Sequence, residues 1–171
     1  MTGIITDNLG RSSGLIKSAA AGESNKPYFR ASLGSTQDIG TTGSWNKLEI
    51  DTVQYDSGSF FDSTTEYRWE PTVAGKYFIY GSATIYGGNG TFRYGNIMVG
   101  KYGSSTEEAR GGGNYSSNYG YILEPYAGSI VDMDGSNDYC AMYVLGYTGG
   151  ATVNVEAGVA ASYFGGFLLT T

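Results

Sequence analysis

The 171-residue sequence contains no histidine. Histidine is the commonest general base in enzymes, the usual partner of a serine or cysteine nucleophile, and a frequent ligand of zinc. Its absence excludes a hydrolase triad of the usual kind. Paired carboxylates remain at Glu107 with Glu108 and at Asp132 with Asp134, and glycosidases use two such groups. Because adjacent loop carboxylates are usually solvated surface charges, we predict that the protein is not an enzyme.

Only one cysteine, Cys140, is present, so no disulfide can form within the chain. Its neighbours in DYCAMYV are apolar, which predicts a buried free thiol. No stretch approaches the roughly 20 apolar residues of a membrane-spanning helix. The opening residues MTGIITDNLGR lack the basic and apolar regions of a signal peptide. We therefore expect a chain that is made in the cytoplasm of its host and folds without redox help.

Charged residues make up only 15% of the chain, and the net charge is −6. Phosphate backbones and anionic lipids are both bound through basic patches, which this balance does not favour. We predict that neither nucleic acid nor a membrane is a partner.

Glycine and tyrosine are abundant instead, with 28 and 16 copies. Short aromatic and β-branched segments recur between Gly, Asn, Asp and Ser, which is typical of strands joined by tight turns. From Pro27 onward the pattern predicts ten strands in an all-β antiparallel sandwich or barrel. The ten segments are YFRASLG, WNKLEIDTVQYD, EYRWEP, KYFIYGSATIY, FRYGNIMVGKY, GYILEPY, SIVDM, YCAMYVLGY, ATVNVEA and SYFGGFLL.

Alternate residues of a strand point to opposite faces of its sheet. In GKYFIYGSATIYGG, Tyr77 and Ile79 share one face, and Phe78 and Tyr80 share the other. Because both faces carry rings, we expect one to pack in the core and the other against a neighbouring subunit. The C-terminal ASYFGGFLLTT must also be covered, since an exposed apolar edge promotes aggregation. The residues predicted for the core or for a subunit interface are Phe78, Tyr80, Tyr163, Phe164, Phe167 and Leu169.

Several motifs occur in the order found in a known family. WNKLEIDTVQYD precedes FFDSTTEYRWEPTVAGKYFIYGSATI, which fits the family pattern at Pro71, Gly75, Tyr77 and Ile79. SYFGGFLL fits the closing pattern Ser-x-Phe-x-Gly-Phe-Leu-Leu. In these features residues 27–171 resemble the globular head of complement component one-q and its tumour-necrosis-factor-like relatives. The resemblance implies a ten-stranded jelly roll that assembles as a tight homotrimer, with the last strand central in the inner sheet near the threefold axis.

The segment EEARGGGNYSSNYGY, residues 107–121, is richer in glycine and tyrosine than the family pattern. Loop-borne functions of the family are therefore not transferred to it. Tyr, Ser, Asn and Gly are common in binding loops, because tyrosine gives contact area at low entropy cost. Two interpretations stay open, a ligand loop formed by Tyr115, Tyr119 and Tyr121 or a surface loop with no partner.

The segment DMDGSND places Asp132, Asp134 and Asp138 close together as hard oxygen ligands of the kind that calcium takes. Gly135 comes too early for a calcium loop, and the twelfth position holds Tyr143 where a glutamate would close the loop. The segment is either a calcium site or a tight turn whose Asp and Asn residues adopt left-handed conformations. We expect no other cofactor.

Residues 1–26 contain no aromatic residue and cannot form a core alone. TGIITDNLGRSSGLIK resembles the start of tail-fibre and other virion proteins of bacterial viruses. The resemblance implies that residues 1–26 are an anchoring arm before a trimeric head at 27–171. The residues predicted to dock it are Ile4, Ile5, Leu9, Arg11, Leu15 and Ile16.

Two functions are compatible with these features. The first is a non-enzymatic decoration or cement protein of a bacteriophage particle, docked on the capsid through its N-terminal arm. The second is a binding module at the tip of a tail fibre or head fibre, which recognises a glycan or protein on the host surface. A fibre normally needs a long shaft, and only residues 1–26 precede the head. We therefore favour the decoration protein, located in the virion, with the capsid or another virion protein as partner.

Overall fold

The computed structural model of the chain describes residues 25–41, 43–87, 92–102, 106–115 and 120–171. In these ranges all regular elements are antiparallel β-strands, arranged in three sheets. The five-stranded sheet consists, in spatial order, of β12 (Tyr126–Met133), β7 (Gly75–Ser82), β15 (Tyr163–Thr170), β1 (Tyr28–Ser32) and β4 (Thr52–Asp56). The six-stranded sheet consists of β10 (Glu107–Asn114), β9 (Phe92–Lys101), β13 (Cys140–Thr148), β6 (Arg68–Trp69) and β5 (Phe61–Asp62), with β3 (Asn46–Lys47) also paired to β13. The four-stranded sheet consists of β11 (Ile122–Leu123), β8 (Ile85–Gly87), β14 (Val153–Val155) and β2 (Gln37–Gly40).

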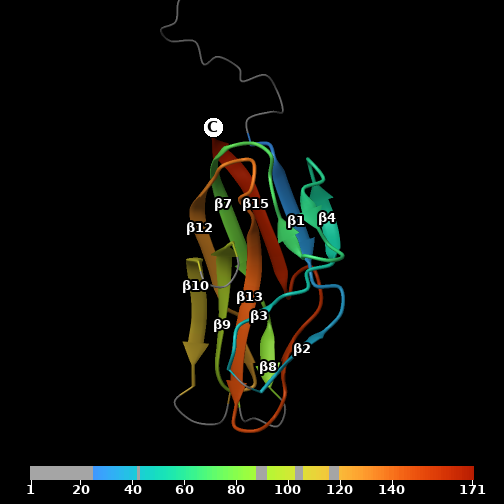
Figure 1. Cartoon of the computed structure of the whole chain (residues 1–171). Coiled ribbons are helices and arrows are strands. Elements are labelled where there is room, and N and C mark those ends of the chain that lie inside the picture. Colours follow the sequence, from blue (N-terminus) through green and yellow to red (C-terminus); the bar gives the residue numbers. More distant parts are fainter. Residues whose placement is uncertain (1–24, 42, 88–91, 103–105, 116–119) are drawn as a thin grey trace, which may run out of the picture.

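The five-stranded and six-stranded sheets are the two layers of a sandwich, and buried residues from both form one core between them. Figure 1 shows that the described chain enters β1 and leaves β15 at the same end of the molecule. The strands β2 and β8 of the four-stranded sheet lie toward the opposite end (Figure 1). The all-β antiparallel sandwich predicted from the sequence is confirmed.

Aromatic rings from both layers meet in the middle of the core. The ring of Phe29 stacks on Trp69 with centroids 4.6 Å apart, and it meets Phe164 edge-on at 5.0 Å. Phe61 also stacks on Phe29 at 5.3 Å, and Tyr77 packs edge-on against Trp69 at 5.2 Å. Fully burying one such side chain stabilises the fold by about 1.5 to 3 kcal/mol. This cluster therefore contributes strongly to holding the two layers together.

The predicted alternation of faces along the central strands is confirmed. In β7, Tyr77 and Ile79 are fully buried, whereas Phe78 and Tyr80 are only partly buried. The C-terminal strand β15 is the middle strand of the five, hydrogen-bonded to β7 on one edge and to β1 on the other. The apolar end of the chain is thus no exposed edge, which agrees with its expected central place.

The predicted count of ten strands is not confirmed, because the described residues form fifteen. The segment KYFIYGSATIY, for example, is split into β7 and β8. Thr84 breaks the strand because its N–H donates to the hydroxyl oxygen of Ser162 at 3.2 Å, and its own hydroxyl donates to the carbonyl of Ala161 at 3.2 Å. These bonds direct the chain from the five-stranded sheet into the four-stranded one.

Strand β10 is the longest element that the sequence analysis did not predict, because EEARGGGN lacks the apolar alternation of a strand. It pairs with β9 along most of its length. A Cβ atom on Gly111 would overlap the carbonyl oxygen of Tyr126 in β12, and one on Gly112 would overlap the side chain of Asn96. Gly111 therefore allows the edge strands of the two layers, β10 and β12, to approach each other closely, and Gly112 makes room for a side chain of the neighbouring strand β9.

Candidate interaction surfaces

The outer face of the five-stranded sheet, turned away from the core, carries a layer of large apolar side chains. We call this layer the aromatic face. Its members come from all five strands and are Tyr28, Tyr55, Phe78, Tyr80, Tyr126, Ile130, Tyr163, Phe167 and Leu169.

The strand register aligns these side chains in rows across the sheet. Ile130 lies opposite Phe78, Phe78 lies opposite Phe167, and Phe167 lies opposite Tyr28. The ring centroids of Phe78 and Phe167 are 5.8 Å apart. Phe78 also stacks on Tyr80 at 5.8 Å. Rings in contact along and across the strands make a continuous apolar surface.

Two glycines lie beside Tyr80 in the next row. Gly128 of β12 and Gly165 of β15 are its direct partners in the sheet. A Cβ atom on Gly165 would lie 2.7 Å from the hydroxyl end of the Tyr80 ring. The ring therefore leans over the bare backbone of β15, which keeps this part of the face flat enough for another protein surface to approach.

The aromatic face is exposed and nearly uncharged. Ile130 is 58% exposed and Tyr126 is 52% exposed. Among the outward-facing residues of β7, β12 and β15, only Lys76 and Asp132 are charged, and their side chains pair with each other at 2.6 Å. Large exposed apolar patches on soluble domains mark interaction sites. The aromatic face has the character of an interface.

Arg30 is the one cation that lies within the aromatic face on β1, and it is already engaged. Its guanidinium lies 4.3 Å from the ring centroid of Tyr163 and donates to the carbonyl of Val159 at 2.9 Å.

The tyrosine hydroxyls add no charge to the aromatic face. Burial raises the pKa of Tyr80 and of Tyr126, so both hydroxyls stay neutral near physiological pH.

The six residues predicted for the core or interface lie in two different places. Phe164 points into the core and is fully buried. The other five, Phe78, Tyr80, Tyr163, Phe167 and Leu169, lie on the aromatic face. The sequence analysis missed the other four members, Tyr28, Tyr55, Tyr126 and Ile130, although the period-2 pattern of YAGSIVDM places the last two on one face of β12.

A shallow hollow of about 300 Å³ opens within the aromatic face. Its walls include the rings of Tyr28, Tyr55, Tyr80 and Phe167, and Gly166 lies beside them. Because this hollow is surrounded by exposed rings, it is suited to receive an apolar side chain from a neighbouring subunit.

The tyrosine-rich segment is only partly a loop. Tyr119 lies outside the described residues. Tyr115 folds back, because its hydroxyl donates to the carbonyl of Ile122 and its ring packs on Phe92 at 6.3 Å. Tyr121 is 64% exposed and lines a second hollow, which lies on the four-stranded sheet. Of the two predicted ligand residues that the structure describes, Tyr121 is therefore the more exposed.

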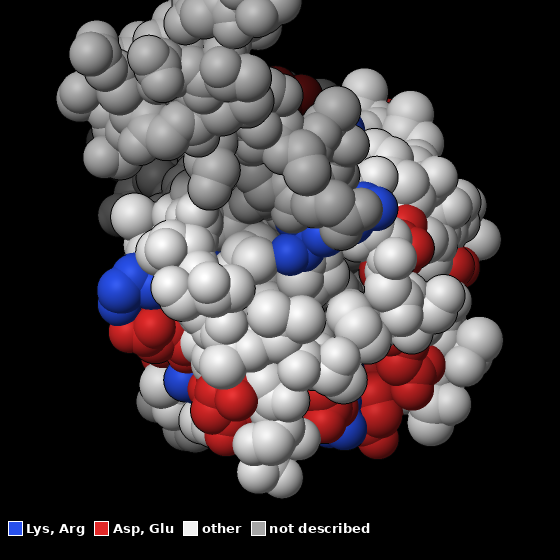
Figure 2. Space-filling view, turned by 90° about the horizontal axis from the view of Figure 1, so that it is seen from above, with Lys and Arg blue, Asp and Glu red and all other residues white. Residues whose placement is uncertain are grey.

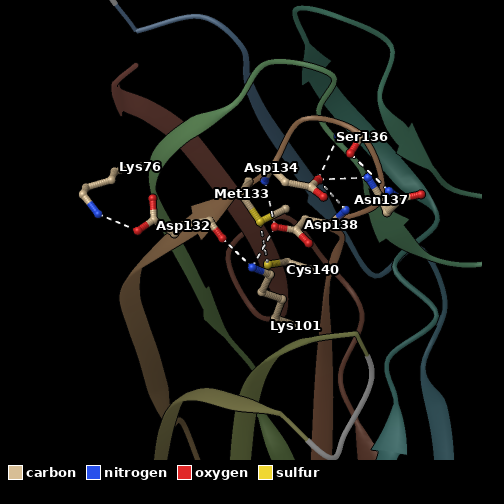
Figure 3. A network of polar contacts seen from close by, with 9 residues as sticks. All are labelled: Lys76, Lys101, Asp132, Met133, Asp134, Ser136, Asn137, Asp138 and Cys140. Carbon is tan, nitrogen blue, oxygen red and sulfur yellow. Dashed lines mark hydrogen bonds and ion pairs between the residues drawn. The ribbon is translucent and has the colours of Figure 1, made fainter.

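The segment DMDGSND forms a turn between β12 and β13 (Figure 3). One carboxylate oxygen of Asp134 accepts the backbone N–H groups of Ser136, Asn137 and Asp138 at 2.8 to 3.1 Å. These bonds hold the pKa of Asp134 well below its ordinary value. Gly135 has a φ of +71°, and its close approach to the backbone of Ala74 leaves no room for a side chain.

The other two aspartates have cationic partners (Figure 3). Asp138 is buried and pairs with the ammonium group of Lys101 at 2.7 Å. The same ammonium donates to the carbonyl oxygen of Asp132 at 2.6 Å, and the Asp132 carboxylate pairs with Lys76. The carboxylates of the three predicted calcium ligands thus bind different partners, and this geometry favours the turn interpretation.

Replacing Asp134 by alanine is expected to lower the melting temperature at neutral pH, because three backbone N–H groups lose their acceptor. A carboxyl whose pKa is lower in the folded chain stabilises the fold above its unfolded pKa of 3.8, and this contribution is lost as the pH falls. The difference in melting temperature between the two proteins should therefore shrink as the pH is lowered from about 4 toward 2. Thermal unfolding followed by circular dichroism at several pH values measures it.

A chelator supplies the second arm of this experiment. We expect the same melting temperature with and without a calcium chelator. If the chelator lowers the melting temperature of the unmodified protein but not that of Asp134→Ala, the segment binds calcium and the turn interpretation is wrong.

The single cysteine lies in this region as well. Cys140 is fully buried and its thiol lies 3.8 Å from the sulfur of Met133. Burial raises the pKa of the thiol to about 12, so it stays protonated at physiological pH. This agrees with the inert, buried thiol expected from its apolar neighbours.

The described parts of the chain contain no cluster of three or more Cys, Asp or Glu residues that could hold a metal ion. They also contain no helix of the length and apolarity needed to cross a membrane.

The predicted docking residues Ile4, Ile5, Leu9, Arg11, Leu15 and Ile16 lie outside the described residues. Figure 2 views the molecule from the end where β15 finishes, and the charged side chains visible there are of both signs and intermingled.

No protein-family model and no curated protein matches this chain. Solved structures do match it. The globular domain of zebrafish complement 1qA aligns with a TM-score of 0.58 and 14% identity, over 84% of this chain and 98% of that domain. Murine APRIL at pH 5.0 aligns with a TM-score of 0.57 and 12% identity, over 83% and 99%. Eiger TNF from S. frugiperda aligns with a TM-score of 0.53 and 10% identity, over 85% and 94%.

These alignments span nearly the whole length of each matched domain and most of this chain, although few residues are identical. The chain has the jelly-roll fold of complement C1q and tumour-necrosis-factor globular heads.

Proposed function

We propose that the protein is a non-enzymatic structural component of a bacteriophage particle. It is a homotrimeric jelly-roll decoration or cement protein, docked on the capsid through residues 1–26. The aromatic face is the observation that carries the self-assembly part of this proposal. The resemblance of residues 1–26 to the start of virion proteins carries the location in the virion.

An exposed sheet of contacting rings is costly in water and favours burial against a second protein surface. The face has few charges that a neighbour would have to desolvate, and Lys76 and Asp132 already neutralise each other at its end. Each chain would bury the rings of β7, β12 and β15. We expect the assembled interface to exceed the roughly 1,200 to 2,000 Å² of an ordinary specific complex.

A threefold arrangement is favoured over a dimer by the resemblance to C1q and TNF heads, which implies a trimer. The middle position of β15 in the five-stranded sheet is compatible with a place near the threefold axis. Phe78 and Phe167 lie opposite each other on β7 and the central strand β15, and we expect both to pack against the neighbouring subunits.

Docking through the arm follows from its apolar residues. Each of the five aliphatic side chains can contribute about 1.5 to 3 kcal/mol if it becomes fully buried. Three arms on one trimer bind together, because the first contact raises the effective concentration of the other two. Weak single contacts would then give firm attachment to a capsid surface.

Deleting residues 1–26 is expected to leave the head assembled and to abolish its attachment to particles. The test mixes full-length and arm-deleted protein with particles that lack it, and measures how much of each sediments with them. We expect the full-length protein in the pellet and the arm-deleted protein in the supernatant.

A full-length variant with Ser at Ile4, Ile5 and Leu9 is the matched control, because it keeps the arm but removes apolar anchors. It should also stay in the supernatant. If all three proteins sediment with the particles to the same extent, the docking surface lies on the head, and docking through the arm is contradicted.

A binding module at the tip of a tail fibre or head fibre is the second candidate. It is favoured by the hollow beside Tyr121, because the four-stranded sheet lies toward the end of the molecule opposite to the start of β1 and the C-terminus (Figure 1). A head attached through its N-terminal arm would present this hollow away from the particle, where a glycan or protein of the host surface could reach it.

A further inference from the structure

The hollow on the four-stranded sheet has a defined lining. It has a volume of about 420 Å³ and is lined by Thr36, Tyr86, Gly87, Tyr121, Ile122 and Glu156. Pockets that bind small ligands typically enclose roughly 300 to 1,000 Å³. The hollow is therefore large enough for a small ring-shaped molecule.

The register of the sheet explains why these residues face outward. Ile122 of β11 lies opposite Tyr86 of β8, and Tyr86 lies opposite Asn154 of β14. Their strand neighbours Ile85 and Val155 are fully buried in the core. Tyr86 and Ile122 therefore belong to the outer side of the sheet, and the hollow is separate from the core.

The chain segment that carries Tyr121 is fixed to the sheet. The N–H of Gly87 donates to the carbonyl of Tyr121 at 3.3 Å. The hydroxyl of Tyr115 reaches the carbonyl of the next residue, Ile122. Both exposed side chains, at 64% for Tyr121 and 51% for Ile122, thus project from a tethered backbone.

The remaining lining is polar. The backbone N–H of Glu156 donates to the carbonyl of Thr84 at 2.9 Å, which fixes the backbone of this residue at the end of β14. Its side chain is exposed and takes part in no ion pair or hydrogen bond with the other described residues. A carboxylate accepts hydrogen bonds only, so it can bind the hydroxyl groups of a ligand. The hydroxyl of Thr36 can both donate and accept.

The lining selects among classes of ligand. Among the described residues no Lys or Arg lines the hollow, and Glu156 with the net charge of −6 repels anions. A purely apolar ligand would leave the carboxylate without a partner. A pyranose ring fits both the aromatic and the acidic part of the lining. Its C–H face can pack on tyrosine, and its hydroxyl groups can donate to the carboxylate.

We infer that this hollow binds a neutral hexose unit of a glycan, with Tyr121 and Tyr86 against the sugar ring and Glu156 as the acceptor of its hydroxyl groups. The inference deepens the second candidate function and depends on the binding role proposed there. It does not depend on the trimer, because all the lining residues come from one chain.

An open hollow of this size gives weak binding to a single sugar, since much of the ligand stays in water. Three hollows at one end of a trimer would bind a polymer of the same sugar far more tightly through effective concentration. Retention on a polysaccharide should therefore be strong, and affinity for the free glycoside should be weak.

The test uses the full-length protein and the methyl glycosides of glucose, galactose, mannose and N-acetylglucosamine as probes. Saturation-transfer NMR measures binding of each glycoside, and retention on dextran, galactan, mannan and chitin measures binding of the polymers. We expect at least one sugar to bind in both assays. Tyr121→Ala should weaken that binding about tenfold or more, and Glu156→Gln should weaken it severalfold.

Tyr102→Ala and Glu49→Gln are matched controls, because Tyr102 is an exposed tyrosine and Glu49 an exposed glutamate outside the hollow. Neither should change binding. Tyr121 and Glu156 are exposed, so we expect Tyr121→Ala and Glu156→Gln to keep the melting temperature of the unmodified protein. That result would show that both variants are folded.

Two results would overturn the inference: no binding of any of the four glycosides, or equal binding by Tyr121→Ala. A failure of assembly gives a different result. An Ile130→Asp protein that is monomeric should lose retention on the polymer and keep its affinity for the free glycoside.

Discussion

Replacing Phe167 by aspartate is expected to convert the assembled protein into monomers. Phe167 lies in the middle of the aromatic face, between Phe78 and Tyr28 in the sheet. In an assembly the new carboxylate would be buried against apolar rings without a partner, which costs several kcal/mol per subunit. Light scattering at micromolar concentration measures the mass, and we expect that of the single 18.1-kDa chain.

A second variant keeps this prediction testable if Phe167→Asp disturbs folding. Ile130 is 58% exposed in the single chain, so Ile130→Asp removes little intramolecular packing and should also give folded monomers. Ile122→Asp is the control, because it puts the same charge on an exposed isoleucine of the four-stranded sheet. It should stay assembled. Full assembly of both Phe167→Asp and Ile130→Asp would exclude the aromatic face as the interface.

Replacing Gly111 by alanine is expected to destabilise the fold by about 3 kcal/mol or more, a large effect for one methyl group. The added Cβ atom would overlap the carbonyl oxygen of Tyr126, and a backbone group cannot move aside as a side chain can. The two layers would have to separate where β10 meets β12. Urea unfolding followed by tyrosine fluorescence measures the loss in the free energy of unfolding.

Gly113→Ala in the same strand is the control for this prediction. The nearest atoms to its new Cβ would be methyl groups of Leu123, at 3.2 and 3.9 Å, and a leucine side chain can adjust. We expect a cost below about 1 kcal/mol. Equal stabilities of the two variants would contradict the close packing of β10 on β12.

The sequence predicted the parts of the fold that depend on period-2 alternation. Tyr77 and Phe78 occupy opposite faces of β7 because successive side chains of a strand must do so. The same rule, with the closing motif, placed Phe164 and Phe167 in β15 and suggested that both of its faces are covered. The aromatic face was therefore largely foreseeable from residue order alone.

Other features depend on long-range contacts that local pattern does not contain. Strand β10 looks like a flexible loop in the sequence, and the need for glycine at position 111 is evident only from the neighbouring backbone of β12. Likewise, the sequence left Asp138 open as a calcium ligand or a turn residue, because its pairing with Lys101, 37 residues earlier in the chain, is not contained in the local pattern. The hollow beside Tyr121 combines residues from four separate segments, so no single motif could have indicated it.

The mass of the unmodified protein in solution tests the proposed assembly most directly. Sedimentation equilibrium over a range of micromolar concentrations should give three times the 18.1-kDa mass of the chain, with no dissociation on dilution through this range. A folded protein that sediments as a single chain at all of these concentrations would contradict the trimer and leave the aromatic face without its proposed role.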